Sequence, residues 1–236
     1  MTVCALVAAF NEEPTIAAVV TGVRRFVPDV VVVDDGSTDR TAECATAAGA
    51  TVVRHARNGG KGAAIRTGLA HVLAGSHSHV LFIDGDFQHD PADIPRLLAA
   101  GQAGGCDLVL AERAFVKASM PTARFYSNRI GSWILSRFIG ADVADTQCGF
   151  RLVRSDCLRG VRLTATGYEI ETEMLIKLVR RRASLGHVGI TARYDGSRSK
   201  LRSIRDTFRT CMMAVRYRYL SRPHTGDRKH SLSRLW

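Results

Sequence analysis

The sequence lacks several features that would place it in a specialised class of protein. No apolar run reaches the roughly 18 residues of a membrane-spanning helix, and there is no internal repeat or low-complexity tract. The six cysteines, at positions 4, 44, 106, 148, 157 and 211, form no CxxC pair, which excludes zinc-knuckle and redox-dithiol spacings. The N-terminal residues enter an apolar run without the basic region of a signal peptide. We therefore expect a cytoplasmic globular protein with reduced thiols.

Positive charge is abundant, and it is unevenly distributed. The chain of 236 residues is 46% hydrophobic, enough to bury a core without a disulfide or a structural metal. Its 33 Lys and Arg exceed its 22 Asp and Glu, giving a net charge of +11. From residue 193 onward there are 12 basic and three acidic residues, so this segment carries +9 of the +11. A basic appendage on a nearly neutral body indicates an anionic partner: phosphate, a lipid headgroup or nucleic acid.

The pattern of apolar residues predicts an α/β fold. Continuous Val, Ile and Leu runs alternate with helical patterns through the first 111 residues. The predicted strands are 3–10, 30–33, 51–53, 80–83 and 107–111, and the predicted helices are 13–26, 38–48, 61–73 and 92–100. The second half is less regular, with helices at 123–139, 171–182 and 203–220 and extended pieces at 145–151 and 187–194. This alternation predicts a mostly parallel sheet covered on both faces, with its ligand beyond the carboxyl ends of the strands.

Paired aspartates stand where two of the predicted strands end. Asp34 and Asp35 close one strand and precede a helix, so they either form a capped turn or bind a base or ribose. Asp84 and Asp86 close another strand. An Asp-Gly hairpin is disfavoured there, because Pro91 and a helical pattern follow instead of a returning strand. Two adjacent carboxylates repel each other, and a divalent cation that bridges to a diphosphate would relieve this repulsion.

Two further groups of residues are weaker signals. The glycine-rich segment 58–62 opens a helix and matches neither a Walker loop nor a dinucleotide fingerprint, so it is either a glycine turn or a phosphate cradle. Arg113, Arg124, Arg151 and Lys200 are scattered basic residues, and taken singly such residues are usually solvated.

Taken together, these motifs resemble a known family. Segments 7–13, 34–39, 58–62, 84–88 and 145–151 occur in the order found in inverting nucleotide-sugar glycosyltransferases of family 2. The sequence is most similar to the branch that contains dolichyl-phosphate mannose synthase and dolichyl-phosphate glucosyltransferase. The likeness covers residues 2–220. It implies a GT-A fold with a Rossmann-like nucleotide-binding half.

The resemblance also implies an organisation and a set of site residues. Residues 1–220 would form one glycosyltransferase domain, in which 1–112 bind the nucleotide sugar and 113–220 bind the acceptor, while 221–236 are a polar basic tail. By this resemblance, the nucleotide is bound by Phe10, Glu12 and Asp35, and Mg²⁺ or Mn²⁺ and the donor diphosphate are held by Asp84, Asp86 and Gln88. The implied catalytic residues are Asp86, Arg113, Arg124 and Lys200. The acceptor or its phosphate would be contacted by Asn128, Asp145, Gln147 and Arg151.

The chemistry of the acceptor separates the possible functions. A lipid phosphate is already ionised and needs no general base, whereas a hydroxyl acceptor needs one. The basic site favours transfer of glucose or mannose from a UDP- or GDP-hexose to a polyprenyl or dolichyl phosphate, with inversion. Asp145, Glu169, Glu171 or Glu173 could act as a base, so transfer to a glycan or small-molecule hydroxyl stays open. Nucleic-acid binding by the basic tail is disfavoured, because few aromatic residues lie among its arginines.

The last predicted helix is amphipathic and basic. Its apolar residues recur at helical spacing, with arginines such as Arg205, Arg209 and Arg216 between them. It could dock on the domain or lie on an anionic membrane surface. The second interpretation predicts a peripheral protein at the inner face of the cell membrane.

Overall fold

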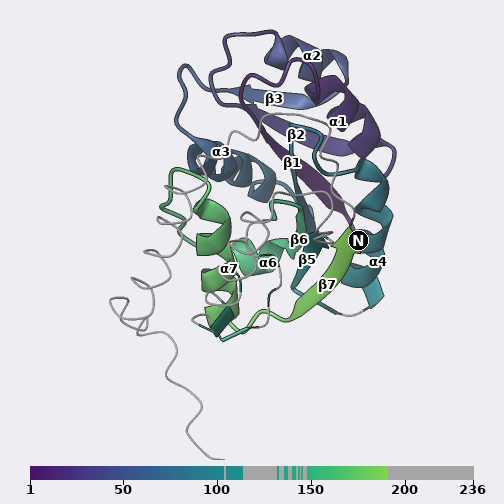
Figure 1. The fold of residues 1–236 in the computed structure, drawn as a ribbon, viewed down its shortest axis with the longest axis vertical. Helices are drawn as coiled ribbons and strands as arrows, with labels where there is room; N and C mark the ends of the chain where they lie inside the picture. Colours follow the sequence, from purple (N-terminus) through teal and green to yellow (C-terminus); the bar gives the residue numbers. More distant parts are fainter. Residues whose placement is uncertain are drawn as a thin grey trace, which may run out of the picture.

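The structure is a computed structural model, which describes residues 1–103, 105–113, 132, 136–137, 140–141, 143, 145 and 148–190. These residues form a seven-stranded sheet in the order β3-β2-β1-β4-β6-β5-β7 (Figure 1). In chain order the strands are β1 (Val3–Ala9), β2 (Asp29–Asp34), β3 (Thr51–Arg54), β4 (His79–Asp84), β5 (Leu108–Arg113), β6 (Arg151–Arg154) and β7 (Leu185–Ile190). All neighbouring strands run parallel except β6, which is antiparallel to both β4 and β5. The predicted mostly parallel sheet is confirmed.

Helices cover both faces of the sheet. They are α1 (Ile16–Arg24), α2 (Thr41–Ala47), α3 (Lys61–Leu73), α4 (Ile94–Ala103), α6 (Ser155–Leu158) and α7 (Ile170–Arg180), with a short 3₁₀ turn η1 (Pro91–Asp93) before α4. In Figure 1, α1, α2 and α4 lie on one side of the sheet, and α3, α6 and α7 on the other.

Two apolar cores result from the alternation of side chains along each buried strand. In β1, Ala5 and Val7 pack in the core that includes α1 and α4, whereas Cys4 and Leu6 pack in the core that includes α3 and α7. Successive side chains of a strand point to opposite faces, so a strand buried on both faces is apolar throughout. This is why β2 reads as four consecutive valines, all of them buried.

Two elements begin later in the chain than predicted. The helix predicted from residue 13 begins at Ile16, because the carbonyl of Glu12 already accepts hydrogen bonds from the Thr15 and Ile16 amides in a tight turn. The extended piece predicted at 145–151 enters the sheet only at Arg151, as the first residue of β6. The predicted helices 123–139 and 203–220 lie largely or wholly outside the described residues.

Within the described part of the chain, no helix is long and apolar enough to cross a membrane.

Candidate active site

The loops that follow β1 and β2 are hydrogen-bonded to each other. The amide of Asn11 donates to Ser37 Oγ at 2.9 Å, and Asn11 Oδ1 accepts from the Thr38 amide at 2.9 Å. Asn11 has a left-handed backbone (φ 52°), and the next amide, of Glu12, donates to Thr41 Oγ1 at 2.8 Å. The predicted nucleotide-binding residues Phe10 and Glu12 therefore lie on a loop whose backbone is fixed by the loop after β2.

Asp35 organises the glycine-rich segment. Its Oδ1 accepts from the Gly59 amide at 3.0 Å and its Oδ2 from the Gly60 amide at 2.7 Å. His55 Nδ1 lies 2.7 Å from Asp35 Oδ1, and His55 Nε2 lies 2.9 Å from Thr67 Oγ1. The carboxylate of Asp35 thus joins the end of β2 to the start of α3, while its contact with a base stays a prediction.

The glycine-rich segment packs against a backbone rather than forming an open phosphate cradle. The Gly62 amide donates to the Thr166 carbonyl at 2.8 Å, and a Cβ on Gly62 would come within 2.2 Å of the Ala165 carbonyl oxygen. Gly60 has a left-handed backbone (φ 87°), and a Cβ there would meet the Thr166 oxygen at 2.4 Å. The amides of Gly59, Gly60 and Gly62 are thus bonded within the protein. The interpretation of this motif as a glycine turn fits this geometry better than the phosphate cradle.

Asp84 and Asp86 lie at the carboxyl end of β4. Burial and the neighbouring charge of Asp84 raise the pKa of Asp86 to about 6. The carboxylate of Asp86 accepts from the Gln88 amide at 3.0 Å, and Thr15 Oγ1 donates to the Gly85 carbonyl at 2.7 Å, which ties this loop to the start of α1. Two neighbouring, partly buried carboxylates, one of which raises the pKa of the other, are oxygen donors of the kind that a divalent cation binds.

The described residues do not by themselves form a complete metal site. No group of three or more His, Cys, Asp or Glu side chains in the described ranges is placed to hold a metal ion. The assignment of Asp84, Asp86 and Gln88 as metal ligands therefore stays a prediction, in which a bound diphosphate would supply the remaining oxygen ligands.

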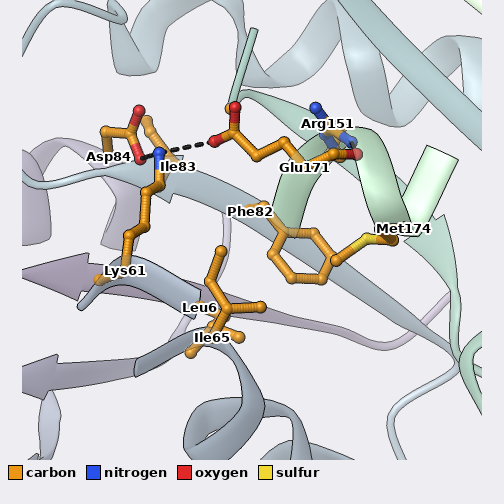
Figure 2. A pocket seen from close by; sticks show the side chains of 11 residues that line it. Leu6, Lys61, Ile65, Phe82, Ile83, Asp84, Arg151, Glu171 and Met174 are labelled. Carbon is orange, nitrogen blue, oxygen red and sulfur yellow. Dashed lines mark hydrogen bonds and ion pairs between the residues drawn. The ribbon is translucent and has the colours of Figure 1, made fainter. Parts of the chain in front are cut away.

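Lys61 is a residue of the site that the sequence motifs do not single out. Its ammonium lies 2.7 Å from Asp84 Oδ1 and 2.5 Å from Glu171 Oε1, as Figure 2 shows. Burial opposes the charge on Lys61, but the two carboxylates outweigh it and raise its pKa. Burial likewise opposes ionisation of Asp84, yet Lys61 holds the pKa of Asp84 below its ordinary value. The sequence does place Lys61 in the glycine-rich segment at the start of a helix. Its partner Glu171, however, is 110 residues away in the chain, so the ion pair could not be predicted from a local motif.

The Lys61 bridge closes one end of a small pocket. Its lining also includes the apolar side chains of Leu6, Ile65, Phe82 and Met174 and the charged side chain of Arg151 (Figure 2). Its cavity volume, about 10 Å³ counted as the space open to the centre of a water molecule, is near the minimum for one water and too small for a hexose.

The structure brings two other predicted residues together. Arg113, at the end of β5, forms a forked pair with Asp145: Nε lies 2.6 Å from Oδ2 and Nη2 lies 3.0 Å from Oδ1. The Asp145 side chain is buried, and such a pair fixes the plane of the guanidinium. Asp145 therefore orients Arg113.

Arg151 is placed differently from the prediction. Its side chain is 1% exposed, and its guanidinium donates to the backbone carbonyls of Glu171 (3.0 Å) and Cys148 (2.5 Å). This placement makes it a buried support for Glu171 and does not favour a direct contact with acceptor phosphate. The physical reason is its position on β6, between β4 and β5 in the middle of the sheet.

His89 is a second residue that the sequence analysis missed. It is 4% exposed, its Nε2 lies 3.9 Å from Asp84 Oδ2, and its ring packs 5.5 Å from that of Phe150. Burial lowers the pKa of His89 to about 4, so it is neutral beside the carboxylate at physiological pH. The predicted residues Arg124, Asn128, Gln147 and Lys200 lie outside the described residues.

Fold and site together define a class of protein. The chain is an α/β protein whose candidate ligand site lies beyond the carboxyl ends of parallel strands, where acidic and basic side chains converge. It belongs to glycosyl transferase family 2, whose family model matches residues 4–162.

Comparisons with individual proteins agree with this family. The chain is 37% identical to the glycosyltransferase AglJ of Haloferax volcanii, over 86% of this chain and 68% of that protein. It is 29% identical to the undecaprenyl-phosphate mannosyltransferase of Micrococcus luteus, over 81% of this chain and 83% of that protein. Among solved structures, glucosyl-3-phosphoglycerate synthase of Mycobacterium tuberculosis with Mn²⁺ and UDP-glucose matches at 25% identity and a TM-score of 0.72, covering 92% of this chain and 78% of that one. The fold is that of the GT-A glycosyltransferases.

The geometry around Asp35 leads to a first prediction. Asp35→Ala is expected to weaken UDP or GDP binding by about 1.5–3 kcal/mol, the range for hydrogen bonds to a charged group. The variant loses the predicted base contact and also the acceptor that holds Gly59 and Gly60 in place. Isothermal titration calorimetry with each nucleotide measures the effect.

Asp39→Ala is the matched control for this experiment. Asp39 accepts hydrogen bonds from the amides of Glu13 and Thr41, so its loss should lower stability by about 1 kcal/mol and change nucleotide affinity less. Equal nucleotide affinity in wild type and the Asp35 variant would show that Asp35 does not contact the base.

Proposed function

We propose that this glycosyltransferase moves a hexose, glucose or mannose, from a UDP- or GDP-sugar to a polyprenyl phosphate with inversion, in the presence of Mg²⁺ or Mn²⁺. Residues 1–112 would bind the donor and 113–220 the acceptor. The similarity to the undecaprenyl-phosphate mannosyltransferase supports a lipid phosphate acceptor. The UDP-glucose and Mn²⁺ named for the similar solved structure support a metal-assisted nucleotide-sugar donor.

The main structural support is how the candidate base residues are engaged. Asp145 is paired with Arg113, and Glu171 with Lys61. Glu173, buried in α7, accepts from the amides of Thr164 and Ala165 and pairs with Lys177 at 2.7 Å. A carboxylate held by a cation is a weak proton acceptor. Three of the four residues considered as bases are therefore poorly suited to the role, and a phosphate acceptor needs none.

The proposed reaction needs no proton transfer by the protein. An oxygen of the acceptor phosphate forms a bond to the anomeric carbon while the bond from that carbon to the donor diphosphate breaks, and the nucleoside diphosphate leaves with its electron pair. A divalent cation held by Asp84, Asp86 and Gln88 would supply Lewis-acid stabilisation of the leaving diphosphate. Arg113, oriented by Asp145, would place positive charge near the sugar and the acceptor phosphate. Arg124 and Lys200 are assigned the same kind of role by the family resemblance.

A pair of acceptors that differ only in the phosphate tests this function. We expect transfer from a UDP- or GDP-hexose to a short polyprenyl phosphate and none to the corresponding polyprenol. Product formation is followed with radiolabelled donor, and NMR of the product gives the anomeric configuration. Transfer to the polyprenol at a similar rate, or retention of configuration, would contradict the proposal.

A second candidate function is transfer to a hydroxyl acceptor. Glu169 is buried, and its Oε2 has no hydrogen-bond partner among the described residues, so it is the least engaged of the four carboxylates. The similar M. tuberculosis enzyme has also been solved with phosphoglyceric acid bound. For such an acceptor Glu169→Gln should abolish transfer, whereas it should have a small effect on transfer to a lipid phosphate.

The basic segment beyond residue 192 gives a further prediction for a membrane-bound acceptor. It lies outside the described residues, and it carries +9 of the net charge. Each basic residue near an anionic surface contributes about 1 kcal/mol, and salt screens this attraction. Changing Arg205, Arg209 and Arg216 together to Gln should release the protein from anionic vesicles at low salt. Transfer to a short soluble prenyl phosphate should persist, and unchanged sedimentation with vesicles would show that the segment does not bind them.

A further inference from the structure

Lys61 occupies the carboxylate that the metal is expected to use. Its ammonium bridges Asp84 Oδ1 and Glu171 Oε1, and it also lies 5.3 Å from the centre of the Tyr168 ring. The Lys61 side chain is 13% exposed. It is thus a fixed cation beside the pair Asp84 and Asp86 rather than a solvated surface charge.

The backbone around Lys61 holds the ammonium in this position. The flanking glycines Gly60 and Gly62 are packed against the 165–166 backbone, so the first turn of α3 cannot shift without breaking that contact. On the opposite side, a Cβ on Gly149 would come within 2.7 Å of Glu171 Oε1 and 2.8 Å of Asp84 Oδ2. The absence of a side chain at Gly149 gives the two carboxylates room to approach one cation.

The positive charge of Lys61 offsets part of the negative charge that would attract a metal ion to this place. The Lys61 ammonium contacts the carboxylates of Asp84 and Glu171, and a third carboxylate, that of Asp86, lies beside Asp84. A positive charge within several ångströms of a divalent ion weakens its binding strongly, even at an effective dielectric constant of about 20. The described residues also lack a full ligand set.

We propose that Lys61 is a resident counter-cation that keeps the metal site weak until a nucleotide diphosphate binds. The diphosphate brings both additional oxygen ligands and the negative charge that offsets Lys61. The inference rests on the proposed nucleotide-sugar donor. It makes Lys61 a positioning residue whose loss should increase the affinity for the metal alone, an effect that the loss of a merely structural contact would not produce.

Mn²⁺ binding measured by electron paramagnetic resonance tests the proposal without any enzymatic turnover. The full chain is titrated with Mn²⁺ in the absence of nucleotide and again with UDP or GDP. Lys61→Met, which keeps the length of the side chain, is expected to bind Mn²⁺ alone at least about tenfold more tightly than wild type. Nucleotide should then enhance Mn²⁺ binding less than it does in wild type. Lys61→Arg, which keeps the charge, should resemble wild type.

Lys177→Met is the matched control. It removes the same charge from another lysine–glutamate pair, formed with Glu173 at 2.7 Å, and it should leave Mn²⁺ affinity unchanged. Mn²⁺ affinity of Lys61→Met no higher than that of wild type or of Lys177→Met would overturn the proposal.

A second variant changes the charge in the opposite direction. Glu171→Gln removes a carboxylate while Lys61 remains on Asp84, so Mn²⁺ alone should bind at least about tenfold more weakly. This variant decides the matter if Lys61→Met fails to fold, and unchanged affinity would overturn the proposal. If neither UDP nor GDP alters Mn²⁺ affinity of the wild type, the proposed donor is wrong. The comparison of variants without nucleotide still shows whether Lys61 acts as the counter-cation.

Discussion

Asp86→Ala is expected to abolish hexose transfer while leaving the protein folded. Asp86 is one of two adjacent carboxylates proposed to hold the divalent cation, which contributes several kcal/mol to stabilising the leaving diphosphate. Its loss should lower the rate by about 10³-fold or more. Initial rates with a UDP- or GDP-hexose and Mn²⁺ measure this. A variant that turns over donor at the wild-type rate, with Mn²⁺ or in EDTA, would refute the metal assignment.

The same substitution should make the metal-free protein more stable at neutral pH. The pKa of Asp86 is about 6 in the native state against an ordinary value of 3.8, so between these values the native state binds more protons than the unfolded state. Stability therefore falls as the pH rises through this window, and Asp86→Ala removes that loss. We expect a gain on the order of 1 kcal/mol at about pH 7.5 that disappears near pH 4, measured by urea denaturation in EDTA.

Asp90→Ala is the control for both experiments. Asp90 lies in the same loop, but its carboxylate accepts from the Ala92 amide and begins the η1 turn. Its loss should cost about 1 kcal/mol of stability and leave transfer close to the wild-type rate.

Arg151→Met is expected to lower the free energy of unfolding by about 3–5 kcal/mol. A buried charge can sometimes be replaced by an apolar side chain at little cost, but here the carbonyls of Glu171 and Cys148 would lose their donors in a buried place. The charge of Arg151 also helps to hold the pKa of Asp84 low. Urea denaturation followed by circular dichroism measures the change.

Arg154→Met, on the same strand, provides the comparison. Arg154 pairs with Asp107 at 2.6 Å, but its side chain is 48% exposed, so its loss should cost no more than about 1 kcal/mol. Equal destabilisation by the two substitutions would contradict the structural role assigned to Arg151.

The sequence predicts best those features that depend on local pattern. Strand β2 and helix α3 lie within a residue or two of their predicted positions. A strand buried on both faces is a continuous apolar run and a helix has a regular apolar spacing, and both patterns can be recognised from neighbouring residues. The aspartates after β2 and β4 could be placed at one edge of the sheet for the same reason. The roles of Asp35 and of the metal ligands stay predictions.

Features that depend on distant contacts could not be predicted in this way. The Lys61–Glu171 bridge joins α3 to α7, and the Arg113–Asp145 pair joins β5 to a residue outside any regular element. No local sequence pattern distinguishes Arg151 from the arginines that lie on the protein surface. Its burial follows from the insertion of β6 between β4 and β5, a topology that no local pattern specifies.

The place of β6 in the sheet has a consequence for how the chain folds. β5 does not pair with β4, the strand before it, but is joined to it through β6, which is synthesised several dozen residues later. On the ribosome, β1 to β4 can pair as they emerge, whereas β5 carries the apolar residues Leu108 to Ala111 with no strand partner until β6 and β7 follow. An unpaired apolar strand is prone to aggregate. The nascent chain therefore most needs protection by a chaperone after β5 has emerged and before β6 is synthesised. For the same reason, we expect fragments that end before residue 151 to be insoluble.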